Sequence, residues 1–200
     1  MNKDILVCGV GGQGTVLASK LIASAAMNRG FNIHCAETIG MAQRGGPVTS
    51  HIRIGEDVFS PLIPKGNADV ILAFEPAEAV RNLSYLKADG TVIVNSVPVK
   101  PISESLNDTG YDGVEMLEYI KSKCHCIIID AQTLCVPFGS SKYFNVAILG
   151  AAVGADAIGL SADDILREIE SLVSDKFVET NKKAFLSGFE NAQSTAQKWG

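Results

Sequence analysis

The chain has 200 residues, which is enough for one domain with a full core and too few for two substantial ones. Its formal net charge is −5 and it has no run of Lys or Arg, so neither nucleic acid nor an anionic membrane is an expected partner. The five cysteines are odd in number and lie in or beside apolar segments, which favours reduced thiols and a cytoplasmic location. We expect no signal peptide, because the N-terminus meets glycines after one short apolar run. We expect no membrane span, because glycines and Asp156 interrupt the longest apolar stretch.

The first part of the chain predicts a βαβ unit. Residues 5–10 are an apolar run typical of a strand, residues 15–29 a helix that ends at Gly30, and residues 31–36 a second strand. A repeating βαβ pattern would place a helix next, but residues 48–54 alternate between apolar and polar side chains. Because Gly55 and Glu56 can turn the chain back into residues 57–63, we expect an inserted β-hairpin here.

The rest of the chain alternates between short apolar runs and longer helical patterns. Strands are predicted at 70–74, 91–95 and 126–130, helices at 77–87, 114–121, 143–158, 162–173 and 179–198, and a surface loop at 97–112. Ser161 is the expected N-cap of the helix that follows it. The pattern indicates a single α/β domain over residues 1–200. We predict a Rossmann-like, doubly wound, mainly parallel sheet with an inserted β-hairpin and a helical C-terminal part.

A glycine-rich segment, GVGGQG, joins the first predicted strand to the first helix. Its spacing, Gly9-x-Gly11-x-x-Gly14, leaves backbone amides at a helix N-terminus, where an anionic group is favoured. Any doubly wound fold also uses glycines at this turn for tight packing, so the spacing alone is a weak signal. Glu37 lies where a dinucleotide-binding protein has its ribose-binding acid, or it orients the loop that follows.

The loop GMAQRGG, residues 40–46, is the segment most typical of a binding site. Its glycines allow another molecule to approach the backbone closely, and Arg44 offers a planar fork of donors that we expect to be exposed. His51 next to Arg53 is either an acid–base pair or a packing residue, and packing is favoured because nothing completes a triad. Cys124-His125-Cys126 is not accompanied by a second Cys/His pair, so no metal site is predicted.

Several segments together resemble a known family. They are GVGGQG, ETIGMAQRGGPVTSHIRIG, SPLIPKGNADVILAFEP, TVIVN and FVETNKKAFLSGFE. The chain resembles the small (beta) subunits of the indolepyruvate ferredoxin oxidoreductases, which are equivalent to the gamma subunit or domain of the pyruvate and other 2-oxoacid:ferredoxin oxidoreductases. The resemblance covers almost the whole chain and is loosest at residues 97–112 and 132–141.

The resemblance implies an oxidoreductase subunit that completes an active complex. A large (alpha) partner subunit is then expected to hold thiamine diphosphate and iron–sulfur clusters, to decarboxylate the 2-oxoacid with coenzyme A as acyl acceptor, and to pass electrons to ferredoxin. No cofactor is expected on this chain, which has no cluster-type set of cysteines and no Gly-Asp-Gly segment. The isolated chain is expected to be inactive, and it could associate with copies of itself through surface meant for the partner.

No catalytic residue is predicted, and the candidate residues are ones that bind a ligand or the partner. They are Gly9, Gly11, Gly12, Gln13, Gly14, Glu37, Met41, Gln43, Arg44, Gly45, Gly46, Ser50 and His51. Two alternatives stay open. In one, the chain is a free-standing Rossmann-type protein that binds NAD(P) or a nucleotide through the glycine turn and Glu37. In the other, it is a structural subunit whose glycines only pack.

Overall fold

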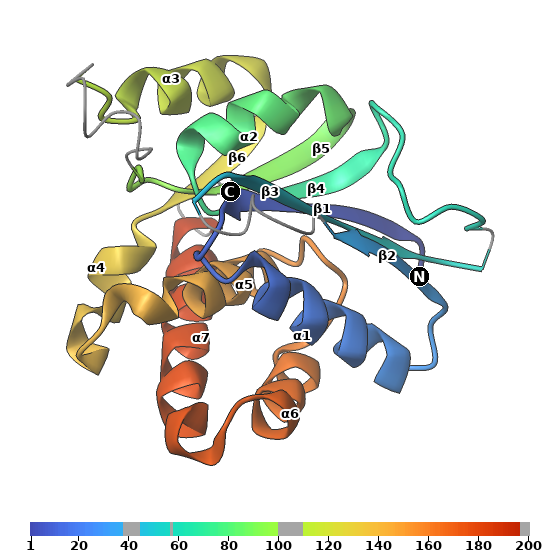
Figure 1. The fold of residues 1–200 in the computed structure, drawn as a ribbon, viewed down its shortest axis with the longest axis vertical. Helices are drawn as coiled ribbons and strands as arrows, with labels where there is room; N and C mark the ends of the chain where they lie inside the picture. Colours follow the sequence, from blue (N-terminus) through green and yellow to red (C-terminus); the bar gives the residue numbers. More distant parts are fainter. Residues whose placement is uncertain (38–44, 57, 100–109, 197–200) are drawn as a thin grey trace.

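A six-stranded sheet lies between two layers of helices (Figure 1). The computed structural model describes residues 1–37, 45–56, 58–99 and 110–196. Helices α2 (Pro76–Asn82) and α3 (Val114–Lys123) cover one face of the sheet. The other face carries α1 (Thr15–Asn28), α5 (Phe144–Gly154), α6 (Ala162–Leu172) and α7 (Asp175–Ala196), with α4 (Ala131–Cys135) at one side.

The strands lie in the order β2-β3-β1-β4-β5-β6. Their bounds are β1 Lys3–Val10, β2 Ile33–Glu37, β3 Pro47–Ile54, β4 Ala68–Ala73, β5 Leu86–Asn95 and β6 His125–Ile129. Strands β1, β4, β5 and β6 are parallel, whereas β3 runs antiparallel to both β1 and β2. The predicted fold class is therefore confirmed, since the sheet is mainly parallel and carries an antiparallel insertion.

The antiparallel insertion is confirmed, but the strand that pairs with residues 48–54 is not the predicted one. The two arms of the hairpin are β2 and β3, and the described residues 58–63 form no strand. Arg53 explains the difference, because its guanidinium donates to the carbonyl oxygens of Ser60 and Leu62 at 3.2 and 3.4 Å. The Arg53 side chain thus holds residues 58–63 in place of strand pairing. Pro61 in this segment also has no N–H to donate to a neighbouring strand.

Local signals set most of the helix ends. Ser161 caps α6 as predicted and shares a capping box with Asp164, and the chain leaves α1 at Gly30. The predicted helix 77–87 is too long. Helix α2 ends at Asn82, whose side-chain Nδ2 donates to the Glu78 carbonyl oxygen. A 3-10 turn (Leu83–Tyr85) follows, and β5 begins at Leu86. Helix α4 and the 3-10 turns Val136–Phe138 and Ser141–Tyr143 were not predicted.

Helix α5 is buried on all sides, with every residue from Phe144 to Val153 inside. It packs against α7 at very short range, and glycines make this contact possible. A Cβ on Gly188 would lie 1.8 Å from the carbonyl oxygen of Ala147, and one on Gly150 would lie 2.0 Å from that of Phe185. Among the described residues, no helix combines the length and the apolar character that a membrane span needs.

We expect Gly150→Ala to destabilise the protein. Alanine favours a helix over glycine by about 1 kcal/mol, but its methyl group would meet the backbone of α7, which can move only with the whole helix. Overpacking of this kind costs about 3 kcal/mol, so the free energy of unfolding in urea is expected to fall. Lys183→Ala on the exposed side of α7 is the control, and equal stability of the two variants would contradict this packing argument.

Candidate functional site

The glycine turn lies where the connections of two neighbouring strands diverge. After β1 the chain enters α1 on one face of the sheet, and after β4 it enters α2 on the other face (Figure 1). In open α/β sheets, ligands bind outside the carboxyl ends of the strands at such a point. Residues 11–14 and 74–76 therefore form the two sides of the candidate site.

Two glycines in the turn have backbone conformations that other residues rarely adopt. Gly12 has φ +98° and Gly14 has φ +84°. A Cβ on Gly14 would lie 2.1 Å from Nδ2 of Asn145, whereas a Cβ on Gly12 would meet no atom within 4 Å. Gly14 is thus required for packing, and the exposed Gly12 faces open space.

The start of α1 has no side-chain cap. Gly14 occupies the N-cap position, and the first turn contains no acidic residue. The first amides of a helix point away from it and carry partial positive charge, so an uncapped end favours an anion. This backbone feature lies beside the open position of Gly12.

The second glycine loop reaches the first. The Gly11 amide donates to the Gly46 carbonyl oxygen at 2.8 Å, so Gly45 and Gly46 lie next to the turn. The antiparallel direction of β3 makes this contact possible, because the first residue of β3, Pro47, pairs with the last residue of β1, Val10. Met41, Gln43 and Arg44 lie outside the described residues.

Gln13 points inward rather than toward a ligand and is only 8% exposed. Its Oε1 accepts from the Val10 amide at 2.6 Å, and its Nε2 donates to the Phe74 carbonyl oxygen at 3.2 Å. A Cβ on Gly9 would lie 2.7 Å from Oε1 of Gln13. The side chain of Gln13 therefore fills the space between the ends of β1 and β4, and Gly9 is needed to make room for it.

Glu37 lies at the end of β2, with β3 between it and β1. Its Oε1 accepts from the hydroxyl of Ser19 in α1 at 2.6 Å. A ribose-binding acid normally follows the strand adjacent to β1, so here the carboxylate is one strand, about 4.8 Å, further from the turn. Glu37 ties β2 to α1.

Ser50 and His51 are buried in β3. Nδ1 of His51 accepts from the Ile63 amide at 3.2 Å, and the ring contacts Tyr85 edge-on at a centroid distance of 5.6 Å. Burial lowers the pKa of His51 below its ordinary value of 6.5. The neighbouring Arg53 instead pairs with Asp4, with Nε 2.8 Å from Oδ1. These contacts support packing rather than acid–base chemistry.

The cysteines do not fit an iron–sulfur cluster. All five are described, and among the described residues no three of Cys, His, Asp and Glu are grouped to hold a metal ion. Burial, together with the carboxylates of Glu78 and Glu75, raises the pKa of the Cys8 thiol, and burial raises that of Cys135 to about 11. In the metal-free chain both are therefore protonated thiols inside the core.

Two residues near the site were not predicted. Glu75 is 2% exposed and caps α2, accepting from the Glu78 amide at 3.0 Å and from the hydroxyl of Tyr111 at 2.6 Å. Asn95 is fully buried at the end of β5. A polar residue that ends an apolar run, as in FE at 74–75 and TVIVN at 91–95, is the signal that could have identified both Glu75 and Asn95.

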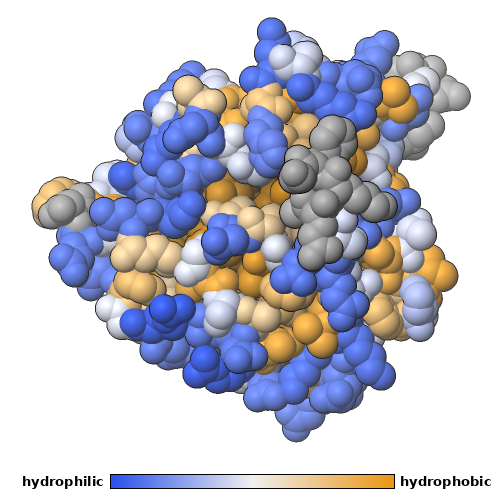
Figure 2. Space-filling view, turned by 180° about the vertical axis from the view of Figure 1, so that it is seen from behind, coloured by the Kyte–Doolittle hydropathy of each residue, from blue (hydrophilic) through white to orange (hydrophobic). Residues whose placement is uncertain are grey.

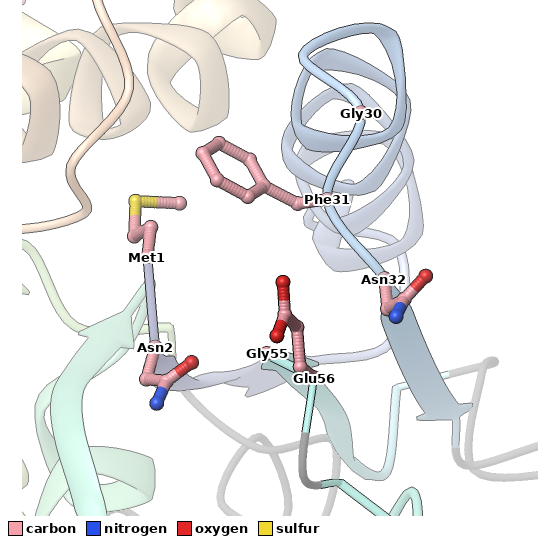
Figure 3. A pocket seen from close by; sticks show the side chains of 7 residues that line it. All are labelled: Met1, Asn2, Gly30, Phe31, Asn32, Gly55 and Glu56. Atoms are coloured by element: carbon pink, nitrogen blue, oxygen red, sulfur yellow. The ribbon is translucent and has the colours of Figure 1, made fainter.

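A separate hollow of about 390 Å³ lies at the opposite end of β1 (Figure 3). It is lined by Met1, Asn2, Gly30, Phe31, Asn32, Gly55 and Glu56. The ring of Phe31 points toward Met1 across it. Because this is the amino end of the parallel strands, the hollow is distinct from the position where α/β sheets bind ligands.

Apolar side chains are also present on the surface (Figure 2). Phe59 is 91% exposed, and Leu62 and Val136 are exposed as well. In Figure 2 apolar residues appear at the centre of the face and toward its right-hand side, with hydrophilic residues between them. Apolar residues that are exposed singly are normal on protein surfaces, so these residues by themselves indicate no contact site.

A family model described as pyruvate ferredoxin/flavodoxin oxidoreductase matches residues 4–191. The chain belongs to this family. It is 36% identical over 193 residues to the indolepyruvate oxidoreductase subunit IorB of Pyrococcus horikoshii, a match that covers 95% of this chain and 96% of the relative. The predicted resemblance is confirmed, and the chain is a subunit of a 2-oxoacid:ferredoxin oxidoreductase.

Solved structures of the family have the same fold. The gamma subunit of a keto/oxoacid ferredoxin oxidoreductase from Geobacter sulfurreducens is 25% identical with a TM-score of 0.70, over 96% of this chain and 99% of that one. A 2-oxoglutarate:ferredoxin oxidoreductase from Magnetococcus marinus, described with 2-oxoglutarate, coenzyme A and succinyl-CoA bound, is 18% identical with a TM-score of 0.68. The match covers 96% of this chain and 31% of that longer chain, and it concerns the fold alone.

The buried His51 predicts how stability depends on pH. Folding favours its neutral form, so the unfolded chain binds the proton more readily, and the free energy of unfolding is expected to fall as the pH drops below 6.5. His51→Asn retains an acceptor for the Ile63 amide but does not titrate. In urea titrations we expect the free energy of unfolding of wild type to exceed that of this variant at pH 7.5, and the difference to become smaller at pH 5.5. A gap independent of pH would contradict the assignment, and His125→Asn on the exposed end of β6 is the control.

Proposed function

We propose that this chain is the accessory subunit of an indolepyruvate-type 2-oxoacid:ferredoxin oxidoreductase. The complex would decarboxylate the 2-oxoacid oxidatively, transfer the acyl group to coenzyme A and pass the electrons to ferredoxin. The observation that carries the proposal is the match to subunits named indolepyruvate oxidoreductase IorB over 95% of the chain. Relatives named as the gamma subunit common to pyruvate and ketoisovalerate oxidoreductases match at 29–31% identity, which favours an indolepyruvate-type substrate over pyruvate.

Thiamine diphosphate and iron–sulfur clusters are assigned to the large (alpha) subunit. The thiols of this chain support the division, because Cys8 and Cys135 are buried in the core and, among the described residues, no three Cys, His, Asp or Glu side chains are grouped to hold a metal ion. When bound in the complex, those groups supply the decarboxylation and electron-transfer chemistry. The contribution of this chain is then structural: it presents a surface that completes the assembly.

The glycine turn is the part of that surface best suited to an anion. Gly12 faces open space, the start of α1 is uncapped, and the turn is joined to the second glycine loop through Gly11 and Gly46. A phosphate of coenzyme A or a carboxylate of the partner has the charge that such a helix end favours. We assign Gly12 and its neighbouring amides to this contact.

The alternative of a free-standing NAD(P)-binding protein has less support. In that class the backbone of the glycine turn must approach a pyrophosphate closely, and an acid must reach the ribose. Gln13 already fills the space between the ends of β1 and β4, and Glu37 already accepts from Ser19. Neither residue is available for a dinucleotide without first losing these contacts.

The direct test of the proposal is reconstitution. The chain is to be co-expressed with a large subunit that has thiamine-diphosphate and four-cysteine cluster motifs and is encoded beside it. Dye reduction that requires indolepyruvate, coenzyme A and both chains is the expected result. Failure of the two chains to associate would refute the proposal.

We expect the purified chain alone to be colourless and inactive. It lacks a set of thiolates for a cluster, so iron and sulfide analysis is expected to give none, and a viologen dye is expected to stay oxidised with indolepyruvate and coenzyme A. Stoichiometric iron, or turnover by the chain alone, would contradict the proposed division of labour.

Gly12→Asn tests the glycine turn. Asparagine tolerates the left-handed conformation better than other residues with a Cβ, so stability is expected to fall by only about 1 kcal/mol. Its side chain would project into the space that we assign to the anion, and we expect at least a tenfold loss in affinity for the large subunit or for coenzyme A. Gly139→Asn is the matched control, because Gly139 also has a positive φ of 76° and no atom near its Cβ position. Equal effects of both variants would remove Gly12 from the site.

Arg44 is the cation that the sequence places in the second glycine loop. Arg44→Lys keeps the charge but loses the planar fork, so we expect weaker assembly or a higher requirement for coenzyme A with little change in the melting temperature of the chain alone. Arg44→Ala is expected to be more severe. Wild-type affinity and turnover in both variants would show that Arg44 has no part in the site.

A further inference from the structure

Asn95 is a fully buried amide at the last position of β5. Its Nδ2 donates to the carbonyl oxygens of Phe74 at 3.3 Å and Val97 at 3.0 Å, and its Oδ1 accepts from the amide of Ala131 at 3.3 Å. A buried amide is costly unless it is hydrogen-bonded, and these three partners satisfy it in one orientation only. Asn95 thus joins the ends of β4 and β5 to the start of α4.

The carbonyl of Phe74 is shared between two side chains. It accepts from Asn95 and also from Nε2 of Gln13 at 3.2 Å. Phe74 lies one residue beyond β4, and the ladder between β4 and β5 ends at the pair Ala73 and Val94. On the other side the Phe74 amide donates to the Cys8 carbonyl oxygen of β1 at 2.8 Å, so the backbone ladder reaches Phe74 there. Its carbonyl oxygen is instead held by two side-chain amides, one from the glycine turn and one from β5.

We infer that Asn95 is a positioning residue for the glycine turn. It holds the Phe74 carbonyl in place, and that carbonyl holds the amide of Gln13, whose Oε1 fixes the Val10 amide at the start of the turn. Asn95 contacts no ligand, because it is fully buried. The inference rests on the proposed function in one respect only, namely that the turn is the contact surface of the complex.

Asn95→Ala removes all three hydrogen bonds, and Asn95→Ser is the milder variant for use if the alanine variant does not fold. The matched control is Asn181→Ala in α7. Asn181 is also a buried asparagine, 5% exposed, and its Nδ2 donates to the Phe177 carbonyl oxygen at 2.8 Å. Its loss removes a buried amide without touching the turn.

Amide hydrogen exchange in the chain alone tests the coupling directly. The amides of Val10 and Gln13 report on the turn, since they donate to the Gln13 side chain and to the Val10 carbonyl oxygen. The Ala151 amide in the fully buried part of α5 reports on overall stability. In Asn95→Ala we expect exchange at Val10 and Gln13 to rise at least tenfold more than at Ala151, and in Asn181→Ala we expect no such excess. A uniform rise at all three amides in Asn95→Ala would overturn the inference.

A double-mutant cycle in the reconstituted complex gives the second readout. Gln13→Ala and Asn95→Ala release the same carbonyl, so we expect each to weaken affinity for the large subunit about tenfold and the double variant to be within about threefold of either one. Asn181→Ala is expected to leave the affinity unchanged, both alone and in combination with Gln13→Ala. Multiplied losses in the first pair would overturn the inference. If the wild-type chain binds no large subunit, the proposed function fails, while the exchange experiment still decides the role of Asn95.

Discussion

The inward amide of Gln13 is the interaction on which the candidate site depends. It accepts a hydrogen bond from the Val10 amide and donates one to the Phe74 carbonyl oxygen. The side chain thus links the ends of β1 and β4 at the point where the connections of these two strands diverge. Many α/β proteins have a crevice at this position, into which a ligand enters. Here the interior of the turn is occupied, so Gly12 on its outer side is the part that another molecule can approach.

Strand β3 determines what surrounds this turn. Because it inserts between β1 and β2 and runs antiparallel to both, its first residues lie at the end of β1, and Gly46 meets Gly11. The same insertion moves Glu37 one strand away from the turn, where it bonds to Ser19. One change in topology thus joins two glycine loops and removes the acid that a dinucleotide would need.

Much of the fold could be predicted from local patterns, and the errors have a common physical cause. The apolar runs of β1, β4 and β6, the cap at Ser161 and the end of α1 at Gly30 depend on neighbours in sequence. The early end of α2 and the irregular path of residues 58–63 depend on distant or side-chain contacts, such as Arg53 with Ser60. The same holds for the candidate site. The glycine spacing could be recognised in the sequence, because it is local. The inward direction of Gln13 and the role of Asn95 could not, because both depend on hydrogen bonds to Phe74, which lies 61 residues from Gln13.

The proposed role of an accessory subunit agrees with a rigid surface rather than a deep pocket. The chain is stiff behind the turn, because α5 is buried on all sides and Asn145 at its start donates to the Gly14 carbonyl oxygen at 3.4 Å. Helix α5 in turn contacts α7 backbone to backbone through Gly150 and Gly188. A contact surface that must match a large partner benefits from such preorganisation, since less conformational entropy is lost on assembly. The close packing of α5 against α7 therefore supports the surface that we propose for contact with the large subunit.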